Sequence, residues 1–338
     1  MTPERAYADT FWQLLAPIRP LLEEPSVSEV LINGPERVFV ERNGQLERTG
    51  CRFAGSTEIL AALRSAAQYG GEDLDERARF VEFALPDGAR VWAVLPPLAC
   101  DGPLVRIRRP TSVHASLSAL SRLGALPRHA ADLLSSRVEA GSNVVVTGRR
   151  RCGKTTLLAA LAAAIPDGHR LVVVDHRREL RLDREHVVHL DAGAMLSETD
   201  SRCQPSAPFR SALSLRPDWI LLSELLGAEA LALVRIMALR SVRCLTTLEA
   251  TTAQDALRRL EMMGSLSDVR LSQEAVRSEI AAGLDLVIHV ESAAGTGFRV
   301  AHAVEVIPSR DARGGFDIRD LFVDRPMHPS SGRAITPG

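Results

Sequence analysis

The sequence predicts an α/β protein with two parts, a small α+β domain followed by a domain built on a mainly parallel sheet. From Leu117 onwards, short apolar segments alternate with helical stretches, as they do where helices cover both faces of parallel strands. Before that point, strands come in pairs with turn residues such as Asn43-Gly44, which favours antiparallel hairpins. A length of 338 residues also fits two domains, since a domain usually holds roughly 100–200 residues.

The first domain is expected to span residues 1–112, with a linker at about 110–117. Residues 7–24 carry apolar side chains at helical spacing, so we expect an amphipathic helix there despite Pro17 and Pro20. The other expected elements are a helix at 56–68 and strands at 27–32, 37–42, 79–85, 90–95 and 104–108.

The second domain is expected to span residues 118–323 and to contain the parallel sheet. The expected strands are 144–147, 171–175, 219–223, 243–248 and 284–290. The tail at 324–338 is rich in Pro, Ser and Gly, so we expect it to be flexible.

A phosphate-binding motif follows the first of these strands. Gly148, Gly153, Lys154 and Thr155 stand at G-x-x-x-x-G-K-T spacing, between the apolar segment Val144–Val146 and an apolar helix. In this motif the backbone N–H groups surround nucleotide phosphates, the lysine reaches the β- and γ-phosphates, and the hydroxyl holds Mg²⁺. The alternative is a chance match on a strand–helix turn, and the flanking strand and helix favour the functional interpretation. The residues expected around ATP and Mg²⁺ are Gly148, Arg151, Cys152, Gly153, Lys154, Thr155 and Thr156.

Composition argues against several classes of protein. A net charge of −1 and an aromatic content of 4% do not favour nucleic-acid binding, despite the basic runs Arg106–Arg109 and Arg149–Arg151. The five cysteines include no C-x-x-C pair, and His186 with His189 fits a surface strand better than a metal site. No signal peptide or membrane span is predicted. We expect a cytoplasmic protein, or one that docks on a membrane through partners.

Two carboxylates follow predicted strands of the second domain. Asp175 ends the segment Leu171–Asp175, and Glu224 follows Trp219–Ser223. In a parallel sheet both strand ends lie on the side of the phosphate loop, where an acid can orient attacking water or support the metal. Capping of the following helix is the alternative role for each acid.

Several further segments resemble the type II/type IV secretion ATPase superfamily, and most closely the assembly ATPases of tight-adherence (Flp-type) pili. Beside the phosphate loop, the segments that carry this resemblance are Pro25–Pro35, Leu85–Val91, Leu95–Arg109, Val174–Leu180, Leu215–Glu224 and Leu226–Ala230. They occur in order from about residue 25 to residue 308 and so cover both predicted domains. Arg-Pro-Asp followed by an apolar strand and a glutamate is the most specific of them.

This resemblance implies a RecA-like P-loop domain and an N-terminal domain that closes over ATP and Mg²⁺. It also implies a homo-hexamer, or a ring mixed with a paralogue, that works with platform proteins at the inner membrane. Lys154, Asp175 and Glu224 would be catalytic, and Thr155 would hold Mg²⁺ with Glu224, directly or through water. Arginines at phosphate-facing positions are Arg90, Arg106, Arg108 and Arg210. The alternative for these arginines is a solvated strand face.

The sequence departs from the family pattern at positions around the phosphate site. Arg151 replaces a glycine in the loop, and Glu249 stands where the family has a histidine that senses the γ-phosphate. Leu226 and Ser214 replace arginines, and Ser223 replaces a glycine. A carboxylate facing phosphates repels them unless a cation intervenes. Two hypotheses therefore stand: an ATP-hydrolysing motor subunit, or a catalytically weak or inactive subunit with a structural or regulatory role.

Overall fold

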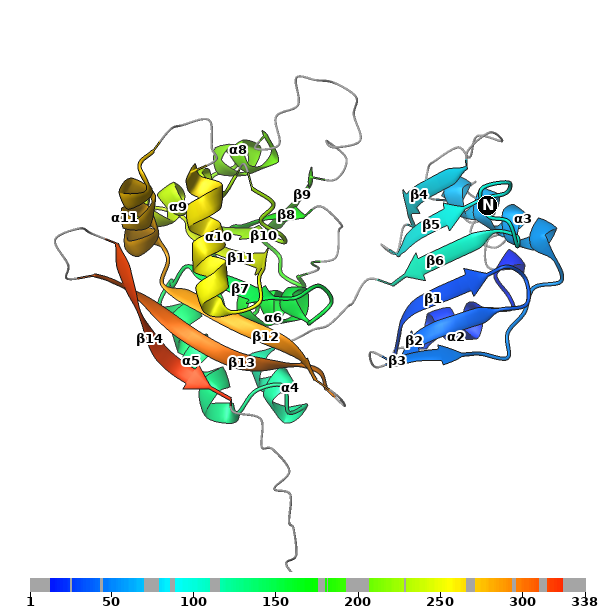
Figure 1. Ribbon diagram of the computed structural model, residues 1–338, viewed down its shortest axis with the longest axis horizontal. Helices are drawn as coiled ribbons and strands as arrows, with labels where there is room; N and C mark the ends of the chain where they lie inside the picture. Colours follow the sequence, from blue (N-terminus) through cyan, green and yellow to red (C-terminus); the bar gives the residue numbers. More distant parts are fainter. Residues whose placement is uncertain are drawn as a thin grey trace, which may run out of the picture. The chain divides into compact units, whose positions relative to one another are not determined.

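The computed structural model describes residues 13–24, 26–42, 45–69, 79–85, 89–109, 116–175, 180, 182–192, 207–227, 229–265, 271–293, 296–309 and 315–324 (Figure 1). The chain divides into two compact units, one of Met1–Val113 with Arg178–Arg181 and one of His114–Arg177 with Leu182–Gly338. Each unit has its own hydrophobic core.

The first unit contains a six-stranded antiparallel sheet in the order β3-β2-β1-β6-β5-β4. The strands are β1 (Val27–Asn33), β2 (Val38–Arg42), β3 (Gln45–Arg48), β4 (Phe80–Ala84), β5 (Arg90–Val94) and β6 (Leu104–Arg108). Helices α2 (Arg19–Glu23) and α3 (Ser56–Tyr69) share the core of this unit. Val105 and Ile107 face that core, so Arg106 and Arg108 lie on the opposite face of the sheet.

The amphipathic helix predicted at 7–24 is interrupted in the part that the structure describes. Residues 13–14 are helical, residues 15–18 form turns, and helix α2 runs from Arg19 to Glu23, with Pro20 in its first turn. Pro17 and Pro20 lack the N–H that a helix interior requires, so apolar spacing alone does not extend the helix. Residues 7–12 lie outside the described residues. The helix predicted at 56–68 is confirmed as α3.

The second unit contains an eight-stranded sheet in the order β14-β13-β12-β7-β11-β10-β8-β9. The strands are β7 (Val144–Gly148), β8 (Leu171–Asp175), β9 (Val187–Asp191), β10 (Trp219–Leu222), β11 (Arg243–Glu249), β12 (Leu286–Ala293), β13 (Gly297–Pro308) and β14 (Phe316–Val323). The run from β12 to β9 is parallel, while β13 and β14 extend the sheet antiparallel. The predicted mainly parallel sheet is therefore confirmed.

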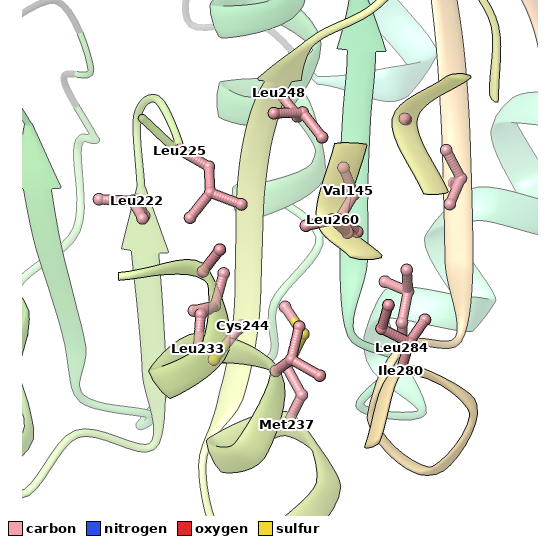
Figure 2. Packing of buried hydrophobic residues seen from close by; sticks show 14 of the residues in the cluster. Val145, Leu222, Leu225, Leu233, Met237, Cys244, Leu248, Leu260, Ile280 and Leu284 are labelled. Carbon is pink, nitrogen blue, oxygen red and sulfur yellow. The ribbon is translucent and has the colours of Figure 1, made fainter. Parts of the chain in front are cut away.

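Helices cover both faces of this sheet (Figure 1). On one face pack α8 (Ala207–Ser214), α9 (Ala230–Leu239), α10 (Ala253–Ser265) and α11 (Gln273–Gly283), and on the other α4 (Leu117–Arg122), α5 (Arg128–Glu139) and α6 (Lys154–Ala162). In the core of the first face, Leu233, Met237, Leu260 and Ile280 of the helices lie against Val145, Leu222, Cys244 and Leu248 of the strands (Figure 2). Leu157 to Ala162 of α6 are all buried, as expected of a helix that is apolar all round.

Two strands of this sheet, β13 and β14, are missing from the sequence prediction. Four of the eight residues of β14 are exposed in succession, so the strand shows no clear alternation of apolar and polar side chains. His189 lies on the edge strand β9 and His186 directly precedes it, in agreement with the interpretation of this segment as a surface strand. Most of the expected linker at 110–117 and of the expected flexible tail at 324–338 lies outside the described residues.

A buried asparagine joins the start of β7 to the helices around it. The Asn143 side chain is fully buried, and its Nδ2 donates to the carbonyl oxygens of Gly283 (2.7 Å) and Met237 (3.3 Å). Its Oδ1 accepts from the backbone N–H of Cys244 at 2.8 Å, and its own N–H donates to Asp285 at 2.7 Å. One residue thereby connects β7 to β11 and to the carboxyl ends of α9 and α11.

We expect Asn143→Ala to lower the free energy of unfolding by about 2–4 kcal/mol, because it leaves buried carbonyl and N–H groups without partners. The thermal unfolding midpoint measures this loss. The matched control Asn33→Ala removes an exposed asparagine side chain and should change stability by less than about 0.5 kcal/mol. An Asn143→Ala midpoint equal to that of the control would contradict the proposed joining role.

Candidate functional site

The predicted phosphate loop joins the carboxyl end of β7 to the amino end of α6. At Gly148, a Cβ atom would lie 2.4 Å from both the carbonyl oxygen of Val290 and the Sγ of Cys152. At Gly153, which has a φ of 87°, a Cβ would lie 2.4 Å from the ring of Phe298. Both glycines are therefore required, because the loop lies directly against β12 and β13.

The lysine of the motif folds back over the loop. Lys154 is the first residue of α6, and its Nζ donates to the carbonyl oxygens of Gly148 (3.1 Å) and Arg149 (2.8 Å). The ammonium group thus lies close to the backbone of the loop, at the positive end of the helix dipole. This arrangement of an ammonium group, loop N–H groups and a helix amino terminus fits the phosphates of a nucleotide.

Arg150, Arg151 and Cys152 of the loop have different surroundings. Arg150 lies with its Nε 3.9 Å from Glu249 Oε2, and both side chains are largely in solvent, at 70% and 44% exposure. An ion pair that is this long and this exposed to solvent contributes little to stability. Arg151 is exposed and has a φ of 60°, a left-handed conformation that costs a residue with a Cβ about 1–2 kcal/mol. The side chain of Cys152 is buried, and this burial raises the pKa of its thiol.

Three acids lie at the same edge of the sheet as the loop. Glu249 ends β11 and pairs in register with Gly148, so it is on the strand next to the loop. Glu224 follows β10, the next strand, and the buried Asp175 ends β8, one strand further. With strands about 4.8 Å apart, these acids sit on strands one, two and three spacings from β7. The structure brings the sequence-predicted Asp175 and Glu224 to the loop's edge, with Glu249 closer.

The segment around Glu224 is held firmly on both sides. The N–H of Ser223 donates to Val174 (3.0 Å) and that of Leu225 donates to Thr247 (2.8 Å), while the hydroxyl of Thr247 donates to the Ser223 carbonyl at 2.6 Å. Glu224 therefore leaves the sheet at a fixed point with its side chain half-buried. A hydroxyl from Thr155 and a carboxylate from Glu224 are hard oxygen donors, which fit Mg²⁺. Among the described residues, no group of three or more His, Cys, Asp or Glu forms a further metal site.

The predicted arginines of the first unit form a cluster of their own. Arg106 pairs with the buried Glu29 and lies 4.8 Å from the centre of the Trp92 ring, and Arg90 pairs with Glu82. Arg108 is next to Arg90 in the register of β5 and β6, on the same face. The guanidinium groups of Arg90 and Arg106 are paired with acids and lie over the Trp92 ring, as is typical of arginine on a half-buried sheet face. Arg210 is an exposed residue of α8 in the second unit.

Phe298 and Val290 are site residues that sequence reasoning missed. They support Gly153 and Gly148 from β13 and β12, and Phe298 is 6% exposed. β13 is not among the predicted strands, so the sequence carried no signal for the contact of Phe298 with the loop.

These features define a P-loop nucleotide-binding domain of the RecA-like class. They are a parallel strand followed by a loop with a glycine at each end, a lysine at the start of the next helix, and acids at the same edge of the sheet. A family model described as type II/IV secretion system protein matches residues 13–294, and the chain belongs to that family. No helix in the described part of the chain is both long and apolar enough to cross a membrane.

Known proteins support this assignment. The chain is 30% identical over 279 residues to a putative conjugal transfer protein of Mycobacterium tuberculosis, covering 81% of this chain and 79% of that protein. It is 31% identical over 312 residues to the type IV secretion system protein PtlH of Bordetella pertussis, covering 84% and 91%. The crystal structure of the pilus retraction motor PilT with bound ADP has the same fold, with a TM-score of 0.58, 16% identity and coverage of 93% and 83%.

We expect Arg151→Gly to raise the free energy of unfolding by about 1 kcal/mol, because glycine adopts a positive φ without the steric cost of a Cβ. Thermal unfolding is the measurement. Arg151→Ala is the matched control, since it removes the guanidinium group but keeps the Cβ, and it should not be stabilising. Equal midpoints for the two variants would mean that the backbone at this position is unstrained.

Proposed function

We propose that this protein is an ATP-binding motor subunit of a type II/type IV secretion machine or of a Flp-type pilus assembly machine. The observation that carries the proposal is the phosphate loop itself, in which Lys154 lies over the carbonyls of Gly148 and Arg149 at the start of α6. ATP would bind with its phosphates in this loop, and hydrolysis would power the export of pilins or other substrates.

The proposed roles of the acids follow from their order along the sheet edge. Thr155 at the start of α6 and Glu224 after β10 would hold Mg²⁺, directly or through water. Asp175, buried at the end of β8, would orient the attacking water. Arg90, Arg106, Arg108 and Arg210 are the proposed phosphate-facing arginines, some of them across a domain or subunit boundary. The N-terminal domain, proposed as residues 1–112, would close over nucleotide held by residues 118–323.

The proposed assembly is a homo-hexamer, or a ring shared with a paralogue, in the cytoplasm beside the inner membrane. It would be held there by platform proteins of the secretion or pilus machine. The relatives named above support such a setting, since PtlH is a type IV secretion system protein and PilT is a pilus retraction motor.

A catalytically weak or inactive subunit is the second candidate, and the charge beside the loop favours it. Glu249 is the acid on the strand adjacent to the loop, and its contact with Arg150 is long and exposed. A carboxylate here opposes phosphate binding, and Leu226, which is 56% exposed, offers no positive charge at a position where the family has an arginine. Such a subunit would bind nucleotide weakly or not at all and serve the ring structurally.

Steady-state phosphate release separates the two candidates. We expect the protein to release phosphate from MgATP at a rate above that of Lys154→Ala, which loses the ammonium group that contacts the loop. A rate equal to that blank would rule out the motor and leave the structural subunit. Thermal stabilisation by MgADP then shows whether the loop is still occupied, since a ligand at 100 times its Kd adds about 2.7 kcal/mol.

We expect Glu249→Gln to strengthen ATP binding several-fold, because it removes a negative charge from the strand next to the loop. Glu249→His should strengthen it at least as much, because it adds a group that can carry positive charge. Equilibrium titration with MgATP is the measurement. Asp167→Asn is a matched control, because Asp167 is an exposed acid beyond the carboxyl end of α6 that is paired with Arg184 at 2.7 Å. Unchanged affinity in both Glu249 variants would mean that this carboxylate does not face the phosphates.

A further inference from the structure

Two buried polar side chains lie side by side at the base of the phosphate loop. In the parallel register of β12 and β7, His289 is opposite Thr147, the residue directly before Gly148. Two residues earlier on the same strands, Val287 and Val145 belong to the core under the helices, so His289 and Thr147 lie on that same face. The two side chains are buried, His289 being 6% exposed and Thr147 0%.

Neither side chain is satisfied within the described residues. Thr147 Oγ1 and His289 Nδ1 are both buried without a hydrogen-bond partner there. The buried hydroxyls of the neighbouring strand β11 differ, since Thr247 donates to Ser223 at 2.6 Å and Thr246 contacts the Thr247 carbonyl at 3.5 Å. An unpaired buried polar atom is costly, and two of them in register leave a polar site with no role in the fold.

His289 is connected to the loop through the backbone. The carbonyl oxygen of the next residue, Val290, is the atom that a Cβ on Gly148 would meet at 2.4 Å. The backbone at Gly148, where the phosphate loop begins, therefore packs directly against the residue that follows His289. The hydroxyl of Thr147 suits either protonation state, because it can donate to a neutral Nδ1 or accept from Nδ1–H.

The groups that face His289 come from several elements. On its own strand, Glu291 Oε1 lies 3.9 Å from Nε2. His302 is opposite on β13 and contacts Asp320 at 2.7 Å, while Arg149 in the loop and Asp255 on α10 also act on the imidazole. Burial is the largest influence and lowers the pKa of His289, which favours the neutral imidazole.

We propose that His289 is a positioning residue that takes up one proton from solvent when a phosphate group binds in the adjacent loop, and releases it when the phosphate leaves. The proton goes to Nδ1, which then donates to Thr147 Oγ1, while Nε2–H faces Glu291. Negative charge in the loop favours the imidazolium ion, and by linkage the imidazolium favours bound phosphate. This inference rests on the proposed nucleotide binding and adds a proton to it.

Calorimetric titration with MgADP tests the proposal on the full chain. Binding is measured from pH 5.5 to pH 8 in two buffers of different ionisation enthalpy, which gives the number of protons taken up. We expect the protein to take up close to one proton per MgADP bound, at the pH values at which His289 is neutral in the free protein and protonated in the complex. Relative to the His289→Asn variant, the affinity of the unchanged protein for MgADP should rise by about tenfold as the pH falls from 8 to 5.5. The titration of ADP itself is common to both proteins and cancels in the comparison.

The two asparagine variants identify the residue. His289→Asn keeps a donor beside Thr147 but cannot titrate, so it should bind at pH 8 about as well as the unchanged protein and lose the proton uptake. His302→Asn, the same change at the opposite histidine, should keep it. Three results would overturn the assignment. They are proton uptake that persists in His289→Asn, no proton uptake by the unchanged protein, and loss of proton uptake in His302→Asn. No MgADP binding at any pH would overturn both this inference and the proposed function, whereas binding without proton uptake overturns this inference alone.

Discussion

The close contact between the phosphate loop and the β12–β13 hairpin is the constraint on which the site depends. A Cβ at Gly148 would collide with the carbonyl of Val290, and a Cβ at Gly153 would collide with the ring of Phe298. The loop therefore has no room to move toward these two strands, and the Lys154 ammonium group contacts the loop's own carbonyl oxygens. The rest of the domain maintains this contact, with Asn143 fixing the start of β7 and the parallel core fixing the strand order.

The electrostatics of the site come from the strand order. Because β11 lies between β7 and β10, the acid next to the loop is Glu249, and Glu224 is one strand further away. Lys154 and the helix amino terminus attract phosphate, while Glu249 opposes it and Arg150 offsets that opposition only across an exposed 3.9 Å contact. The balance between these charges decides whether the proposed motor or the structural subunit describes the protein.

Much of the fold follows from local pattern. Buried parallel strands read as continuous apolar runs, so β7, β8, β10, β11 and β12 are visible in the sequence, as is the glycine and lysine spacing of the loop. The short helix α2 and the strand β14 are less predictable. In the first, Pro17 and Pro20 interrupt an apolar pattern, and in the second the exposed side chains of an edge strand remove the pattern.

The sequence by itself determined the class of the protein, the strand–loop–helix segment of the phosphate loop, and the positions of Asp175 and Glu224 at the ends of strands, because each depends on residues near one another in the chain. Only the tertiary structure decided which strand lies beside which. That order puts Glu249 nearest the loop, Phe298 under Gly153, and the unsatisfied His289 beside Thr147. The physical reason is that strand pairing joins residues more than a hundred positions apart, and no local pattern records such a contact.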